Sequence, residues 1–165
     1  IASSGLHSNG FSLVRKVVFD QYKMDLQERI EEIGGSLGEE LLRPTRIYVK
    51  TILNLTRDFN ISGIAHITGG GITGNLPRVI PKGCKAIVRK GSWDIPPIFS
   101  LLKEKGKIPD EEMLRTFNNG IGMILSVRSK EVEDILARLQ TLGEKAYMIG
   151  EVEKTEREEG TIEFV

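Results

Sequence analysis

Three consecutive glycines form the part of the sequence best suited to binding a ligand. Gly69, Gly70 and Gly71 follow Thr68, the last residue of a short β-branched segment that begins at Ile61. Because glycine tolerates positive φ, successive backbone N–H groups can turn toward one anion, and a helix after the loop would add its positive end. The pattern predicts a phosphate-binding loop. A flexible turn between a strand and a helix is the alternative interpretation.

A second polar segment lies near the start of the chain. His7, Ser8, Asn9 and Gly10 place an imidazole, a hydroxyl and an amide together where a helix is expected to begin. These groups can donate and accept hydrogen bonds, so a polar ligand could bind there. The alternative is that Ser8 and Asn9 cap the helix and His7 is a surface residue.

A third candidate lies at the end of a later helix. Arg115, Asn118 and Asn119 occur just before an apolar segment of strand length, and loops at such positions often contact ligands in α/β proteins. Arg115 could bind a phosphate through two N–H groups. Alternatively, its charge serves only the negative end of the helix dipole.

The sequence lacks the patterns of several common catalytic sites. His7, His66 and Cys84 have no recognisable zinc-ligand spacing, so we predict no transition-metal site. There is no serine nucleophile elbow, dinucleotide-binding glycine pattern or phosphate-loop lysine. No catalytic residue is therefore assigned from the sequence.

Composition and charge narrow the class of protein. The 165 residues include 23 Lys and Arg and 23 Asp and Glu, so no net positive field favours nucleic acid or an anionic membrane. Cys84 is the only cysteine, and no apolar run reaches the roughly 20 residues of a membrane span. We expect one cytoplasmic domain, residues 1–165, with no nucleic-acid or membrane partner. The first residue, Ile1, favours a missing upstream part.

Helix and strand patterns alternate along the chain without an internal repeat. Apolar spacing and cap signals predict helices at 10–22, 44–60, 76–80, 96–106, 109–117 and 129–143, with a short one ending near 41–42. Strands are predicted at 61–68, 84–90, 121–127, 146–152 and 161–165. We therefore expect an α/β (α+β) fold, a mixed β-sheet with helices packed mainly on one face.

Several short blocks of the sequence, taken in their order along the chain, resemble those of a known protein family. They are SSGLHSNGFSLVRK (3–16), PTRIYV (44–49), AHITGGG (65–71), NLPRV (75–79), RTFN (115–118) with Gly120 and Gly122-Met123, and Ile149-Gly150. Together they resemble the C-terminal half of the AIR synthetases, the phosphoribosylformylglycinamidine cyclo-ligases. Collinear blocks are far more specific than any one short motif.

The resemblance implies an ATP-dependent ring closure in purine biosynthesis. Phosphoryl transfer to the formyl oxygen of formylglycinamidine ribonucleotide would activate it, and the amidine nitrogen would then displace phosphate. ATP and Mg2+ would be bound mainly by an N-terminal domain that is absent from this chain. That domain and a small-molecule nucleotide substrate are the expected partners, in a full-length homodimer. The C-terminal half alone should be inactive.

The resemblance also implies roles for individual residues. Gly69, Gly70 and Gly71 would cradle a phosphate, with Thr68 beside them. The segment 7–10 would face the cleft between the two halves, and the remaining polar residues would orient the substrate. Those orienting residues are His66, Arg115 and Asn118.

Two features depart from the resemblance, and related functions remain open. Family members usually carry cysteine where Asn119 stands, and segments 20–40 and 151–165 match nothing specific. Other members of the superfamily are the formylglycinamidine ribonucleotide synthetases, the selenophosphate synthetases and the thiamine monophosphate kinases. A non-catalytic phosphate-binding module is the alternative from another class.

Overall fold

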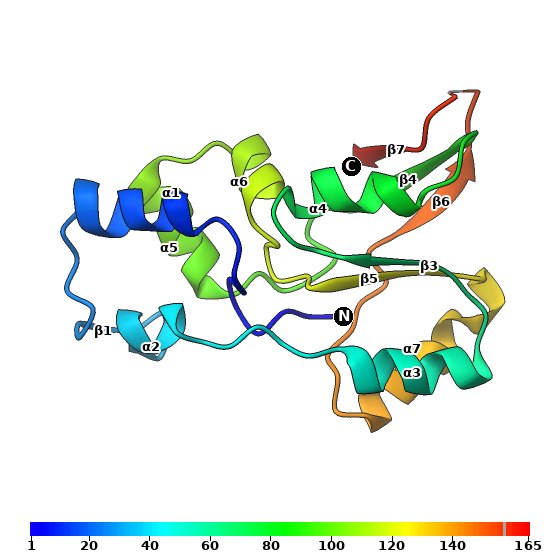
Figure 1. The fold of residues 1–165 in the computed structure, drawn as a ribbon, viewed down its shortest axis with the longest axis horizontal. Coiled ribbons are helices and arrows are strands. Elements are labelled where there is room, and N and C mark those ends of the chain that lie inside the picture. The colour runs from blue at the N-terminus through cyan, green and yellow to red at the C-terminus, as the bar shows by residue number, and fades with distance from the viewer. Residues whose placement is uncertain (157) are drawn as a thin grey trace.

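The computed structural model describes residues 1–156 and 158–165 (Figure 1). Its helical segments are α1 (Phe11–Arg15) continued by η1 (Lys16–Gln21), α2 (Leu37–Leu41), α3 (Val49–Asp58), α4 (Gly71–Asn75) continued by η2 (Leu76–Val79), α5 (Pro97–Gly106), α6 (Asp110–Thr116), η3 (Ser129–Glu131) and α7 (Val132–Thr141). Its strands are β1 (Arg29–Ile30), β2 (Gly35–Ser36), β3 (Ile61–His66), β4 (Cys84–Val88), β5 (Met123–Val127), β6 (Gly150–Lys154) and β7 (Thr161–Phe164). The expected α/β class is confirmed.

The strands of the described residues form three small sheets. β1 and β2 pair in a hairpin, and β3 pairs antiparallel with β5. The third sheet has the order β6-β4-β7, with β4 antiparallel to β6 and parallel to β7. One sheet is therefore mixed, as expected, but β3 and β5 stand apart from it.

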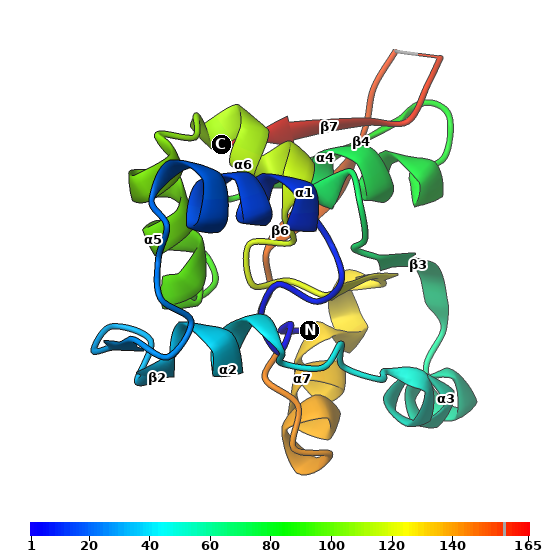
Figure 2. The ribbon, with the colours of Figure 1, turned by 60° about the vertical axis from the view of Figure 1, so that its left-hand side comes forward.

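Helices cover both faces of the β3–β5 pair. α3 and α7 pack against one face through a cluster that includes Leu55, Ile135 and Leu139. α4 and η2 pack against the other face around Ile67 and Ile72. Figures 1 and 2 show α4 on the opposite side of β3 and β5 from α7. Burial of one leucine contributes about 1.5–3 kcal/mol, so both faces stabilise the pair.

The end of the molecule that holds α1, α5 and α6 has its own core. Phe99 and Phe117 meet edge to face, with ring centroids 6.1 Å apart, and Val14, Ile98 and Leu102 surround them. All five side chains are at most 1% exposed. This core fixes the C-terminal end of α6, where the candidate site lies.

Most predicted elements are present, but several boundaries differ, and the β1–β2 hairpin was not predicted. α4 begins at Gly71, five residues before the helix predicted at 76–80. α3 begins at Val49 and not at 44–45, because Pro44 and Thr45 bind the start of the chain. The hydroxyl of Ser4 donates to the Pro44 carbonyl at 2.7 Å, and the hydroxyls of Ser8 and Thr45 lie 3.1 Å apart. The strand predicted at 146–152 corresponds to β6, but β6 begins at Gly150, and residues 146–149 lie before it.

No helix in the described part of the chain is long and apolar enough to cross a bilayer.

Candidate functional site

Two of the three predicted polar segments meet the third at the C-terminal end of α6. Gly10, the N-cap of α1, lies against Phe117 so closely that a Cβ would stand 2.7 Å from the ring atom Cδ1. Gly71 has φ 58°, and its Cβ would overlap the backbone oxygens of Leu114 and Phe117. Only glycine fits either position. We call this region, Gly10, Gly71, Leu114, Phe117 and Asn118, the α6 junction.

Asn118 joins the α6 junction to the start of the chain. Its side-chain Nδ2 donates to the carbonyls of Gly5 at 2.9 Å and Leu6 at 3.1 Å. Its Oδ1 accepts from the Ser3 hydroxyl at 3.0 Å and from the Gly120 N–H at 2.8 Å. The residue has no exposed surface. Both amide hydrogens and the amide oxygen are therefore used within the protein, and Asn118 positions segment 3–6.

Asn75 determines the shape of the glycine loop. Its Nδ2 donates to the carbonyls of Thr68 at 3.2 Å, Gly69 at 3.3 Å and Gly71 at 2.8 Å, and its Oδ1 accepts from the Thr68 hydroxyl at 3.2 Å. In a trans peptide the N–H points opposite to the preceding carbonyl. The N–H groups of Gly69 and Gly70 therefore point away from Asn75, and no described residue accepts a hydrogen bond from them.

His7 is buried and not the surface residue of the alternative interpretation. It is 4% exposed and has φ 56°. Its Nε2 accepts the N–H groups of Ser4 at 3.1 Å and Arg46 at 3.4 Å, so the proton of the neutral ring is on Nδ1. No described residue accepts from that buried Nδ1. Burial, then the charges of His66 and Arg46, lower the pKa of His7 to about 4.

Tyr48 lies between the two histidines. Its ring centroid is 6.2 Å from that of His7 and 6.1 Å from that of His66, which is exposed at the end of β3. The Tyr48 hydroxyl donates to the Ala2 carbonyl at 2.8 Å, and burial raises its pKa. From the sequence, Tyr48 was only a residue of the helix predicted at 44–60 and of the PTRIYV block. Its contact with both histidines needed the tertiary structure.

The other predicted residues are more exposed. Gly10 caps α1 without a side-chain hydrogen bond, so the proposed capping by Ser8 or Asn9 is absent. Arg115 projects from α6 with its side chain 71% exposed and pairs with Glu112 at 2.6 Å. These polar groups are therefore accessible to a ligand or to another domain.

Asn119 has a structural role at the same place. Its Nδ2 donates to the carbonyls of Met113 at 2.8 Å and Phe117 at 3.2 Å, and its backbone oxygen accepts from Trp93 Nε1 at 2.8 Å. Its φ of 47° is one that asparagine tolerates well. The residue therefore holds the end of α6 by hydrogen bonds, without a thiol.

Comparison with known proteins places this arrangement in a family. Residues 1–163 match the model described as AIR synthase related protein, C-terminal domain. The chain belongs to this AIR synthase-related family. Curated relatives include the phosphoribosylformylglycinamidine cyclo-ligases of Syntrophus aciditrophicus, 58% identical over 99% of the chain, and Syntrophotalea carbinolica, 58% identical over 96%. The chain spans 47% and 45% of their lengths, respectively, and corresponds to their C-terminal part.

A solved structure supports the fold assignment. The thiamine-monophosphate kinase of Stenotrophomonas maltophilia K279a matches with a TM-score of 0.64 and 16% identity, over 98% of this chain and 48% of that one. At this identity the likeness concerns the fold alone. A protein with a widely different sequence therefore shares this fold.

Within the described residues of this AIR synthase-related domain, no group of three or more His, Cys, Asp or Glu side chains is arranged to hold a metal ion.

Proposed function

We propose that this chain is the C-terminal part of a phosphoribosylformylglycinamidine cyclo-ligase. The full-length enzyme would convert formylglycinamidine ribonucleotide and ATP to aminoimidazole ribonucleotide, ADP and phosphate, in the cytoplasm. The observation that supports this most is the meeting of three polar segments, distant in sequence, at the α6 junction. It occurs in a chain 58% identical to relatives that carry this name.

The glycine loop is the proposed phosphate-binding element. The N–H groups of Gly69 and Gly70 point away from Asn75 and are available to an anion, either a substrate phosphate or a phosphate of ATP. Gly71 serves a different purpose, because its N–H donates to the Thr68 carbonyl at 3.0 Å. In this proposal Thr68 and Asn75 hold the loop in shape.

The segment 7–10 and His66 would face the cleft toward the N-terminal half. At neutral pH His7 is an uncharged hydrogen-bond donor through Nδ1, and we propose that its acceptor comes from the substrate or from the other half. Ser8, Asn9 and Arg115 are accessible enough to bind polar groups directly. Asn118 is a positioning residue, and none of these residues is assigned as a catalytic acid or base.

ATP and Mg2+ belong mainly to the N-terminal half in this proposal. The described residues fit a phosphate through the glycine loop but do not fit a metal ion, since they supply no cluster of ligating side chains. Mg2+ bound elsewhere would offset phosphate charge during transfer. Half of the site is then missing from the 165-residue chain, so it should not turn over alone. The full-length enzyme is proposed to be a homodimer.

The activity is tested on the full-length protein. Formylglycinamidine ribonucleotide with ATP should give the imidazole product, with one ADP and one phosphate released per ring closed. Parallel reactions would offer the substrates of the alternatives: formylglycinamide ribonucleotide with glutamine, selenide, and thiamine monophosphate. ATP consumption with one of these and none with formylglycinamidine ribonucleotide would overturn the proposal. Turnover by the 165-residue chain alone would contradict the proposal that the active site is shared between the N-terminal and C-terminal halves.

The phosphate loop is tested by Gly70→Val in the full-length protein. The nearest atoms to a Cβ at Gly70 would be Gly74 Cα at 3.5 Å and Asn75 Nδ2 at 3.6 Å, so a side chain has room there. The φ of Gly70 is 102°, a value that residues other than glycine rarely adopt. A β-branched side chain should weaken ligand binding by more than tenfold, because it strains the loop and narrows the space beside its N–H groups. Gly74→Ala is the control, since its Cβ would meet nothing within 4 Å. If calorimetry shows unchanged affinity of Gly70→Val for both formylglycinamidine ribonucleotide and ATP, the glycine loop does not bind a phosphate.

His66→Ala is the companion variant. Loss of this exposed imidazole should weaken substrate binding and leave ATP binding intact, because the backbone N–H groups of the loop remain. Equal affinity for substrate in the variant and the wild type would remove His66 from the site.

A further inference from the structure

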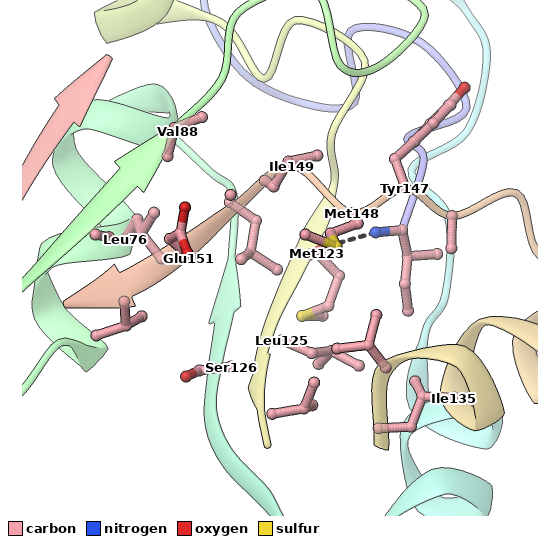
Figure 3. A pocket seen from close by; sticks show the side chains of 18 of the residues that line it. Leu76, Val88, Met123, Leu125, Ser126, Ile135, Tyr147, Met148, Ile149 and Glu151 are labelled. Atoms are coloured by element: carbon pink, nitrogen blue, oxygen red, sulfur yellow. Dashed lines mark hydrogen bonds between the residues drawn. The ribbon is translucent and has the colours of Figure 1, made fainter. Parts of the chain in front are cut away.

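An apolar groove of about 430 Å3 lies between β5, residues 146–152 and α7 (Figure 3). We call it the β5 groove. Five consecutive residues of β5, 123–127, line it, so the groove follows the edge of the strand and not only one face. Leu136 and Leu139 of α7 and Ile149 form other parts of its wall. The wall of the groove is mostly apolar, and extended apolar surface of this kind is typically covered by another part of the protein or by a partner.

The edge of β5 in this groove has unpaired backbone groups. Ile67 N–H donates to the Gly122 carbonyl at 2.9 Å, whereas the Gly122 N–H points the other way and donates to the Ile1 carbonyl at 3.1 Å. Within β5, Ile124 stands opposite Ala65 and Ser126 opposite Gly63, and this register directs the backbone of these even-numbered residues toward β3. Because backbone groups alternate along a strand, Leu125 and Val127 direct theirs away from β3, into the groove. No described strand pairs with them there. The edge is therefore ready to accept another strand.

The start of the chain already pairs with the residues around the start of β5: Ala2 forms an antiparallel bridge with Ile121, and Ile1 extends this pairing to Met123. The nitrogen of Ile1 donates to the Met123 carbonyl at 2.8 Å, and the Met123 N–H donates to the Ile1 carbonyl at 3.3 Å. This reciprocal pairing is that of an antiparallel ladder. The Gly122 N–H also donates to the Ile1 carbonyl, at 3.1 Å, so Gly122 and Met123 form a β-bulge opposite Ile1. Ile1 is 7% exposed, and burial lowers the pKa of its amino group to about 6. A buried charged amine is unfavourable, whereas a peptide N–H suits the same place.

We propose that the polypeptide preceding Ile1 in the full-length protein continues as a strand along β5 and fills the β5 groove. The relatives are about twice as long as this chain, which corresponds to their C-terminal part, so such a segment exists in them. The proposal rests on family membership and on this geometry. It does not rest on the proposed activity, and a protein inactive as a cyclo-ligase would still contain this strand.

The register of the strand follows from the pair formed by Ile1 and Met123. The residue two positions before Ile1 pairs with Leu125, and the residue four positions before it pairs with Val127. The Ala2 N–H donates to the Lys145 carbonyl at 2.8 Å, on the opposite side from β5. The new strand thus lies between β5 and the segment that leads to β6. It would bring the β3–β5 pair and the β6-β4-β7 sheet into one layer.

The chemistry of the groove predicts the composition of the strand. Aliphatic side chains make up most of its wall, and burial of an unpaired charge among them would be costly. The four residues before Ile1 should be mainly apolar or β-branched. A run of charged residues there would overturn the proposal.

Hydrogen exchange in the full-length protein tests the pairing directly. The amides of Ile124 and Ser126 face β3 and serve as internal controls, since they should be protected in any case. The amides of Leu125 and Val127 should be protected to a similar extent, at least a hundredfold above unstructured amides. Rapid exchange of Leu125 and Val127 beside slow exchange of Ile124 and Ser126 would refute the strand.

A proline variant identifies the occupant. In the full-length protein, proline two positions before Ile1 removes the N–H that would donate to Leu125. Exchange at Leu125 and Val127 should rise at least tenfold, with Ile124 and Ser126 unchanged. If protection survives the proline, another segment fills the groove and the proposal is wrong. Protection that depends on protein concentration would instead indicate a second copy and would equally overturn it. If the variant fails to fold, the exchange pattern of the wild type decides alone.

Discussion

The α6 junction and the β5 groove differ in how many of their polar groups and apolar surfaces find partners within this chain. At the junction, Gly10 lets the backbone approach the Phe117 ring and Gly71 lets it approach the backbone of α6, and Asn118 uses both amide hydrogens and its amide oxygen. In the groove, the backbone of Leu125 and Val127 faces an apolar space with no described partner. The comparison teaches that the proposed ligand-binding region is formed within this chain. The β5 groove, by contrast, has backbone groups and apolar surface that a further segment could cover.

The strongest test of the junction is Gly71→Ala. A Cβ there would overlap the backbone oxygens of Leu114 and Phe117, which cannot move without shifting α6. Backbone overlap and positive φ together should cost more than about 4 kcal/mol in the free energy of unfolding. Gly69→Ala is the control, because its Cβ would meet nothing within 4 Å. Chemical denaturation of both variants provides the measurement, and equal stability would show that the junction is not tightly packed.

The next effect concerns the hydrogen bonds of Asn118. Asn118→Leu would leave the buried Leu6 carbonyl and the Gly120 N–H without a hydrogen-bond partner, while the Gly5 carbonyl would keep only the Ser3 hydroxyl. The expected loss is about 3 kcal/mol, since each unsatisfied buried group costs roughly 1–3 kcal/mol and some will find water. Arg115→Ala, an exposed change three residues earlier, should alter stability by less than about 0.5 kcal/mol. A denaturation midpoint for Asn118→Leu close to that of Arg115→Ala would contradict the assigned role.

His7 should make stability depend on pH. Its pKa is about 4 in the folded protein and 6.5 when unperturbed, so between these values the unfolded chain binds a proton that the folded chain excludes. Stability is therefore full above pH 6.5 and falls as the pH drops toward 4, by about 2–3 kcal/mol. His7→Asn removes the titration and keeps a residue that tolerates positive φ. Unfolding measured from pH 4 to 7 should be flatter for His7→Asn than for the exposed control His66→Asn.

In the 165-residue chain, the smallest effect on stability is expected in the β5 groove. Leu136→Ala in the 165-residue chain should cost about 1 kcal/mol or less, because that side chain borders the groove and is only partly buried. In the full-length protein, with the groove covered, the cost should rise to about 2–4 kcal/mol. Leu102→Ala, in the core around α5, is the matched control and should cost the same in both. An equal cost for Leu136→Ala in the two proteins would show that the groove stays uncovered.

Local patterns predicted the helices well where spacing and stop signals agreed. The helix predicted at 129–143 contains α7, in which Ile135 and Leu139 are buried, and the helix predicted at 96–106 matches α5, which begins at Pro97 and ends at Gly106. The start of α3 was misplaced, because Thr45 has helix-start chemistry but its hydroxyl contacts Ser8. Such a contact joins residues far apart in the chain, so no local pattern reports it.

In the candidate site, too, local sequence was informative about residue types but not about contacts between distant residues. Residue types were enough to select the glycine loop, segment 7–10 and the end of α6. They did not show that His7 is buried beside Tyr48, or that Asn118 binds the protein itself. They also missed Asn75 as the residue that shapes the loop.

The sequence by itself determined the elements, the candidate segments and the family resemblance, because propensity, periodicity and motif order are properties of neighbouring residues. Only the tertiary structure decided which segments meet, which amides are already paired and which strand edge remains open. Those features depend on contacts between distant residues, such as Ile1 with Met123, whose free energy depends on the surrounding packing.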